Sequence, residues 1–115
     1  MIPTIHAPAP DVPLACVPGA IPAAERGAHF RLVQRLFGEA ARERRAVPGG
    51  YAWRFDADAL GDLARWMENE RRCCPFLAFT LELSPAGGPL WVRLTGPEGT
   101  REFLDAELPA SPARA

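Results

Sequence analysis

The sequence contains no lysine, and all thirteen of its basic residues are arginines. We attribute this bias to GC-rich coding and not to a role in recognition. The charges of the sequence nearly balance, because fourteen acidic residues against thirteen arginines leave a formal net charge of −1. Binding to nucleic acid or to an anionic membrane surface normally requires a basic excess. The composition therefore predicts neither partner.

Long apolar stretches are absent as well. No run approaches the roughly 20 apolar residues that a membrane-spanning helix needs. The N-terminus lacks a basic region followed by an apolar stretch, so we expect no signal peptide. These absences favour a cytoplasmic protein that does not enter a membrane.

The sequence contains few cysteines, and their spacing matches no disulfide framework. The count of three is odd, and no Cys-x-x-Cys pair occurs. A disulfide scaffold and a thioredoxin-like oxidoreductase are therefore not indicated. The pattern favours a reducing compartment, with thiols that are either free or bound to a metal.

The remaining composition is that of an ordinary globular protein. The 115 residues are 48% apolar and 23% charged, enough for one domain with a modest core. Four prolines in the first thirteen residues predict a flexible lead-in over 1–13. We expect a single domain over 14–108, a frayed tail over 109–115, and no internal repeat.

Hydrophobic periodicity predicts an alternation of helices and strands. The expected elements are a helix over about 22–45, a strand over 51–55, a helix from 57 to 73 or 74, strands over 76–84 and 90–95, and a helix from about 96 to 108. The order α-β-α-β-β-α predicts an α+β fold. We expect a two-layer sandwich in which helices cover one face of a small mixed sheet.

The stretch richest in possible chemistry is 70–76, Glu-Arg-Arg-Cys-Cys-Pro-Phe. Pro75 cannot continue a helix, so Cys73 and Cys74 lie where the second helix turns into the next strand. The partial negative charge at a helix C-terminus disfavours a thiolate. A metal-bound thiolate is therefore favoured here over an unaided one.

These residues resemble a family of short, largely uncharacterised bacterial proteins with the motif Glu-Arg-x-Cys-Cys-Pro-Phe, found here at 70–76. The resemblance extends over most of 14–108 and includes Gly50-Tyr51 and the stretch 94–99. It also includes a cysteine before the first helix, matched by Cys16, and a histidine within it, matched by His29. It implies no established activity. Some members are linked to heavy-metal or arsenic resistance.

A third thiol completes a candidate metal site. Cys16 together with Cys73 and Cys74 offers three sulfurs, which suit Zn(II), Cu(I), Hg(II) or As(III). Either Glu70 or His29 is expected to close the site. Glu70 on an apolar margin needs a partner, because an unpaired buried carboxylate is costly. That partner is either the metal site itself or an arginine such as Arg71. We expect Arg71 to contact a metal ligand without binding the metal.

Two other classes of function stay open. In a thiol enzyme, Cys73 or Cys74 would be the nucleophile, with Cys16 as resolving thiol or His29 as base. In an interaction module the cysteines would be structural, and the uncovered sheet face would bind a partner through aromatic residues such as Trp53, Phe76 and Trp91. The sequence does not decide whether the protein is an enzyme, or whether it forms a homodimer.

Overall fold

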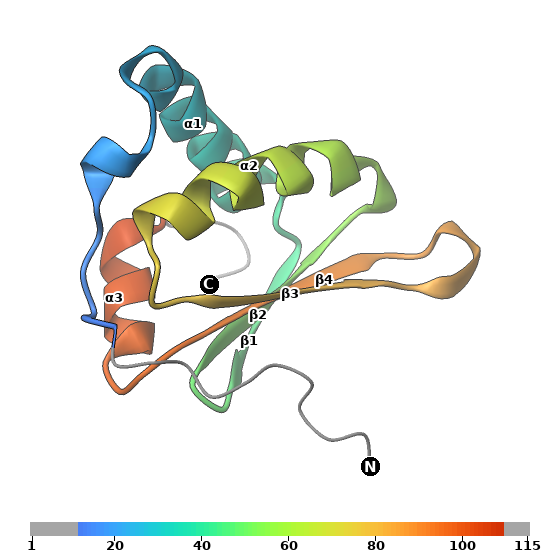
Figure 1. The fold of residues 1–115 in the computed structure, drawn as a ribbon. Coiled ribbons are helices and arrows are strands. Elements are labelled where there is room, and N and C mark those ends of the chain that lie inside the picture. The colour runs from blue at the N-terminus through green and yellow to red at the C-terminus, as the bar shows by residue number, and fades with distance from the viewer. Residues whose placement is uncertain (1–11, 110–115) are drawn as a thin grey trace.

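The computed structural model describes residues 12–109, so nearly all of the expected lead-in and tail falls outside the described residues. The α+β class is confirmed, and the order of the predicted elements is nearly as expected (Figure 1). The helices and strands are α1 Ala23–Arg35, β1 Glu43–Val47, β2 Gly50–Phe55, α2 Leu60–Cys73, β3 Ala78–Leu83, β4 Leu90–Thr95 and α3 Thr100–Glu107.

The prediction of a mixed sheet is wrong, because every strand pairing is antiparallel. The four strands lie in the order β1-β2-β4-β3. Strands β2 and β3 run in the same direction but do not touch, since β4 lies between them. The apolar side chains of β4, at Leu90, Val92 and Leu94, are nearly fully buried, whereas Leu83 of β3 is 55% exposed. Strand β4 therefore lies in the buried centre of the sheet and β3 at its more exposed edge.

Strand β1 was not predicted. The first helix was expected to reach residue 45, but α1 ends at Arg35 and a single π-helical turn continues it to Ala40. Residues 43–47 contain good helix formers and no apolar alternation, so local pattern gives no strand signal. A two-residue loop, Pro48-Gly49, folds this segment back onto β2, and Gly49 adopts the left-handed φ of 81°. Pairing with β2 overrides the local preference.

Phe37 is the centre of the aromatic core. It lies in the π-helical turn and is 1% exposed. Its ring centroid is 5.1 Å from that of Trp53, 5.6 Å from Phe55 and 4.8 Å from Trp66, each in an edge-to-face arrangement. The same ring thus joins the sheet to α2. Phe30 of α1, by contrast, is 63% exposed.

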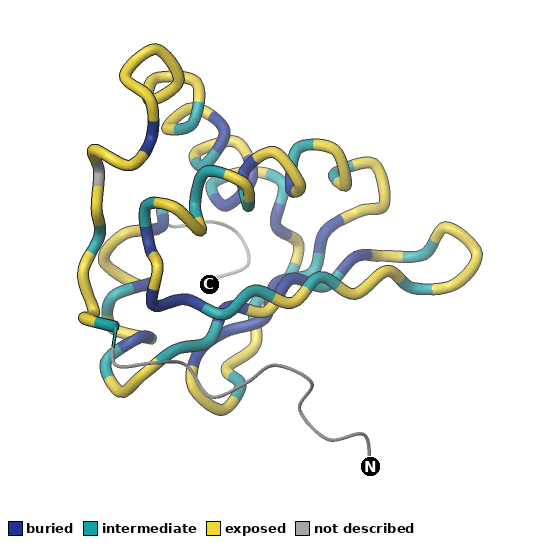
Figure 2. The backbone as a smooth tube through the Cα atoms, in the orientation of Figure 1, coloured by how far each residue is buried: buried dark blue, intermediate teal, exposed yellow. Residues whose placement is uncertain are grey.

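The helices cover one face of the sheet, as predicted, and Figure 2 shows the buried residues concentrated between these layers. The opposite face carries a shallow hollow of about 440 Å³ lined by Arg45, Val47, Ala52, Thr80, Glu82, Trp91 and Arg93. Trp53 and Phe76 are buried in the core, so of the three proposed aromatics only Trp91 lies on this face. Within residues 12–109, no helix is long and apolar enough to cross a membrane.

Candidate metal centre

Helix α2 presents the junction cysteines to the core. Its buried side chains include Leu63 and Trp66, both 0% exposed, and Cys74 follows its last turn at 1% exposure. The buried face is therefore centred near Leu63 and Trp66, whereas Leu60 and Arg71 are exposed. Glu70 lies on this inward side, which explains how a carboxylate reaches the cysteines.

The backbone leaves the helix at Cys74, whose φ of −119° and ψ of 74° are not helical. Pro75 follows and lacks the N–H that another helical turn would need. The amide of Cys74 still donates to the Glu70 carbonyl at 2.7 Å. The side chains of Glu70, Cys73 and Cys74 are therefore held together on one final turn.

The segment 12–21 before α1, called the strap below, brings Cys16 to this turn. It runs past α3 to the end of α2 (Figure 1), and the amide of Val17 donates to the Cys73 carbonyl at 2.6 Å. That carbonyl lies at a helix C-terminus and has no intrahelical partner. Leu14 and Val17 are 39% and 49% exposed. Backbone hydrogen bonding and Cys16 itself therefore hold this part of the strap more than its apolar side chains do.

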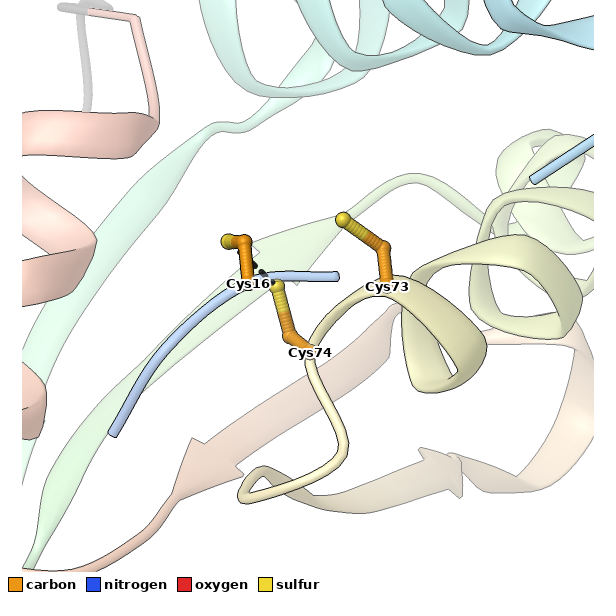
Figure 3. Close-up of side chains that lie close together, drawn as sticks. All are labelled: Cys16, Cys73 and Cys74. Carbon is orange, nitrogen blue, oxygen red and sulfur yellow. Dashed lines mark hydrogen bonds between the residues drawn. The ribbon is translucent and has the colours of Figure 1, made fainter. Parts of the chain in front are cut away.

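The three sulfurs converge, as Figure 3 shows for the labelled side chains. The Sγ atoms of Cys16 and Cys74 are 3.3 Å apart, and all three Sγ atoms lie within 4.8 Å of one another. Three thiolates at about 2.3 Å from a tetrahedral Zn(II) would be separated by about 3.8 Å. Side-chain shifts of roughly 1 Å would convert the observed cluster into that geometry. The donor set therefore fits a soft ion.

Glu70 and His29 form a second, adjoining group. The thiol of Cys74 donates to one oxygen of Glu70 at 3.2 Å, and Nε2 of His29 lies 2.9 Å from the other oxygen. The side chains of His29 and Glu70 are 9% and 14% exposed, and Nδ1 of His29 is buried without a hydrogen-bond partner. Glu70 thus lies between the histidine and the thiols, and it orients both.

Burial controls the protonation of the two thiols closest to each other. Desolvation is the largest cause that raises the pKa of Cys16, from its ordinary 9.0 to about 11. Desolvation also raises the pKa of Cys74, and the negative charge of Glu70 adds to this effect. A low-pKa nucleophile needs the opposite environment, with a nearby cation. The arrangement is therefore unfavourable for the thiol-enzyme alternative, and His29 faces a carboxylate instead of a sulfur.

The predicted site residues separate into three groups. Cys16, Cys73 and Cys74 come together; Glu70 and His29 adjoin them; Arg71 is exposed and borders a different surface hollow with Met67 and Leu81. The expected arginine partner of Glu70 is replaced by His29. The contribution of the strap backbone was missed, because no sequence signal indicates that Val17 caps α2.

Comparisons of the chain with protein-family models, with curated proteins and with solved structures found no match. The fold and the site define an α+β protein with a clustered three-cysteine centre.

Alkylation by iodoacetamide tests the environment of Cys16. Raising the pKa by two units lowers the thiolate fraction at neutral pH about a hundredfold, which higher intrinsic nucleophilicity partly offsets. We expect Cys16 in the metal-free folded protein to react about tenfold more slowly at pH 7.5 than in guanidinium-unfolded protein. Tryptic peptide 1–26 contains Cys16 alone, so mass spectrometry reads its rate separately. A folded-state rate above the unfolded one would indicate an activated thiol and favour the enzyme alternative.

Proposed function

We propose that this protein binds a soft metal or metalloid ion through the thiolates of Cys16, Cys73 and Cys74. The main support for the proposal is that the three Sγ atoms lie within 4.8 Å of one another. Cys16 belongs to a segment at least 57 residues away in sequence from the one that contains Cys73 and Cys74. Packing alone does not require sulfur at these three positions. Soft ions prefer such a ligand set.

The candidate ions are Zn(II), Cu(I), Hg(II) and As(III). Hg(II), Cu(I) and As(III) can be held by sulfur alone, whereas Zn(II) takes a fourth ligand in a tetrahedral site. Glu70 is the nearest candidate, since its oxygen is already 3.2 Å from Sγ of Cys74. His29 would then orient Glu70 from behind, as partners of metal ligands commonly do.

We infer a role in metal resistance or homeostasis in the cytoplasm. Support comes from the resemblance of 70–76 to the motif of the bacterial family, together with a donor set that suits toxic soft ions. A reducing compartment would keep the three cysteines as thiols. Membership of that family is part of the proposal.

Native mass spectrometry of the reduced protein, titrated with each of the four ions, tests the proposal. We expect one ion per chain for at least one of them, with loss of binding in the double variant Cys73→Ser plus Cys74→Ser. Glu70→Gln should weaken Zn(II) binding by roughly 10–100-fold, as loss of an outer-shell or weak ligand typically does. Binding that survives in the double variant would overturn the proposal.

Two variants provide matched controls. Val17→Ser introduces a serine, as the cysteine variants do, but on the strap and at a side chain that is 49% exposed. It keeps the backbone N–H of Val17 that donates to the Cys73 carbonyl. Glu68→Gln removes an exposed carboxylate of α2 that forms an ion pair with Arg72. Both should bind the ion as the unaltered protein does, so a loss in either would point to a general effect on folding.

A further inference from the structure

We propose that Cys16 and Cys74 form a disulfide when the protein meets a hydroperoxide, and that this bond expels the bound ion. Expulsion of the ion rests on the proposed function, whereas formation of the disulfide concerns the metal-free protein alone. The observation that carries it is the 3.3 Å separation of the two Sγ atoms, which belong to residues 58 positions apart.

The pair can reach disulfide geometry with little movement. An S–S bond of about 2.05 Å requires an approach of about 1.3 Å. Cys74 is fixed by the end of α2 and by its hydrogen bond to Glu70. Cys16 lies on the strap, where the flanking side chains of Leu14 and Val17 are 39% and 49% exposed, so the strap is the side that can move. The adjacent cysteines 73 and 74 would close a strained ring instead.

The access of the oxidant to each thiol sets the order in which the two cysteines react. Cys16 is half-buried and Cys74 is buried, so within this pair the oxidant reaches Cys16 first. The sulfur of Cys16 attacks one peroxide oxygen, the O–O bond breaks, and Cys16 becomes a sulfenic acid while one water leaves. The sulfur of Cys74 then displaces the hydroxyl group, which leaves as a second water with the thiol proton. Two thiols lose two electrons and two protons in total, and the hydroperoxide is reduced to two waters, or to water and an alcohol.

The disulfide removes two of the three thiolates from the metal centre. Cys73 alone remains as a sulfur ligand, with Glu70 on the far side of the former Cys74 thiol. One thiolate and one carboxylate do not make a closed soft-ion site. Oxidation therefore acts as a release mechanism, and a reductant restores the site.

The test starts with the reduced, metal-free, full-length protein. After treatment with hydrogen peroxide and blocking of free thiols, trypsin without reductant should yield peptide 1–26 joined to peptide 73–93. Free thiols measured in denaturant should fall from three to one and return to three after reduction. Cys73→Ser should retain the cross-link, whereas Cys16→Ser and Cys74→Ser should each lose it.

Sulfinic acid formation without a cross-link, or a cross-link that persists in Cys74→Ser and is lost in Cys73→Ser, would overturn the proposed pair. The ion is tested separately. Protein loaded with the ion that binds best should lose it in native mass spectra after peroxide and regain binding after reduction. If the cross-link forms but the reduced protein binds none of the four ions, the proposed function fails and the disulfide stands. If the ion binds and no cross-link forms, the redox proposal fails and the metal function stands.

Discussion

Replacing Cys16 with serine is expected to abolish the increase in Tm that the bound ion gives to the unaltered protein. An ion at a hundred times its Kd stabilises the folded state by about 2.7 kcal/mol, which corresponds to roughly 10 °C for a domain of this size. A serine hydroxyl is a hard oxygen donor and does not replace a thiolate for a soft ion. Because Cys16 is half-buried, the metal-free variant should differ from the metal-free parent by only about 1 kcal/mol.

Differential scanning fluorimetry with and without the ion measures both quantities on the same samples. Val17→Ser serves as control and should keep the full ion-dependent increase, since its side chain is 49% exposed. An increase in Tm of the Cys16→Ser protein equal to that of the parent would show that Cys16 is not a ligand. The centre would then be a site of two thiols.

Phe37→Ala is expected to cost about 3–5 kcal/mol of unfolding free energy, the range for deleting a large buried aromatic ring. The ring is 1% exposed and contacts Trp53, Phe55 and Trp66 in edge-to-face pairs. Its loss opens a cavity where the sheet meets α2. Against a total stability of about 5–15 kcal/mol, this change should leave the protein close to unfolding at physiological temperature.

Urea denaturation followed by tryptophan fluorescence gives the comparison. Phe30→Ala is the matched control, because it deletes the same ring seven residues earlier, at a position 63% exposed. It should change stability by no more than about 0.5 kcal/mol. Equal costs for the two variants would contradict the assignment of Phe37 as the centre of the core.

The cysteine cluster was predictable because its local signals agree. Pro75 fixes where the helix ends, and this places Cys73 and Cys74 at a junction. Cys16 was expected to join them as a third ligand, and its segment does reach this junction, where the amide of Val17 hydrogen-bonds to the end of α2. The partner of Glu70 was not predictable, since the pairing with His29 joins α1 to α2 across 41 residues of sequence.

The sheet shows the same division between local and long-range information. Alternation located β2, β3 and β4, because apolar side chains recur at every second position in each; they are buried in β2 and β4 and partly buried at Phe79 and Leu81 of β3. It could not locate β1, an edge strand whose residues 43–47 are half-buried or exposed. Nor could it place β4 between β2 and β3, since strand order depends on contacts that close only in the folded chain.

X-ray absorption at the zinc edge of the Zn(II)-loaded, reduced protein reports directly which atoms contact the ion. We expect a first shell dominated by three sulfur scatterers at about 2.3 Å, with one lighter oxygen or nitrogen atom nearer 2.0 Å. The sulfur count should fall to two in Cys16→Ser. A first shell of oxygen and nitrogen alone in the unaltered protein would contradict a metal centre built from Cys16, Cys73 and Cys74.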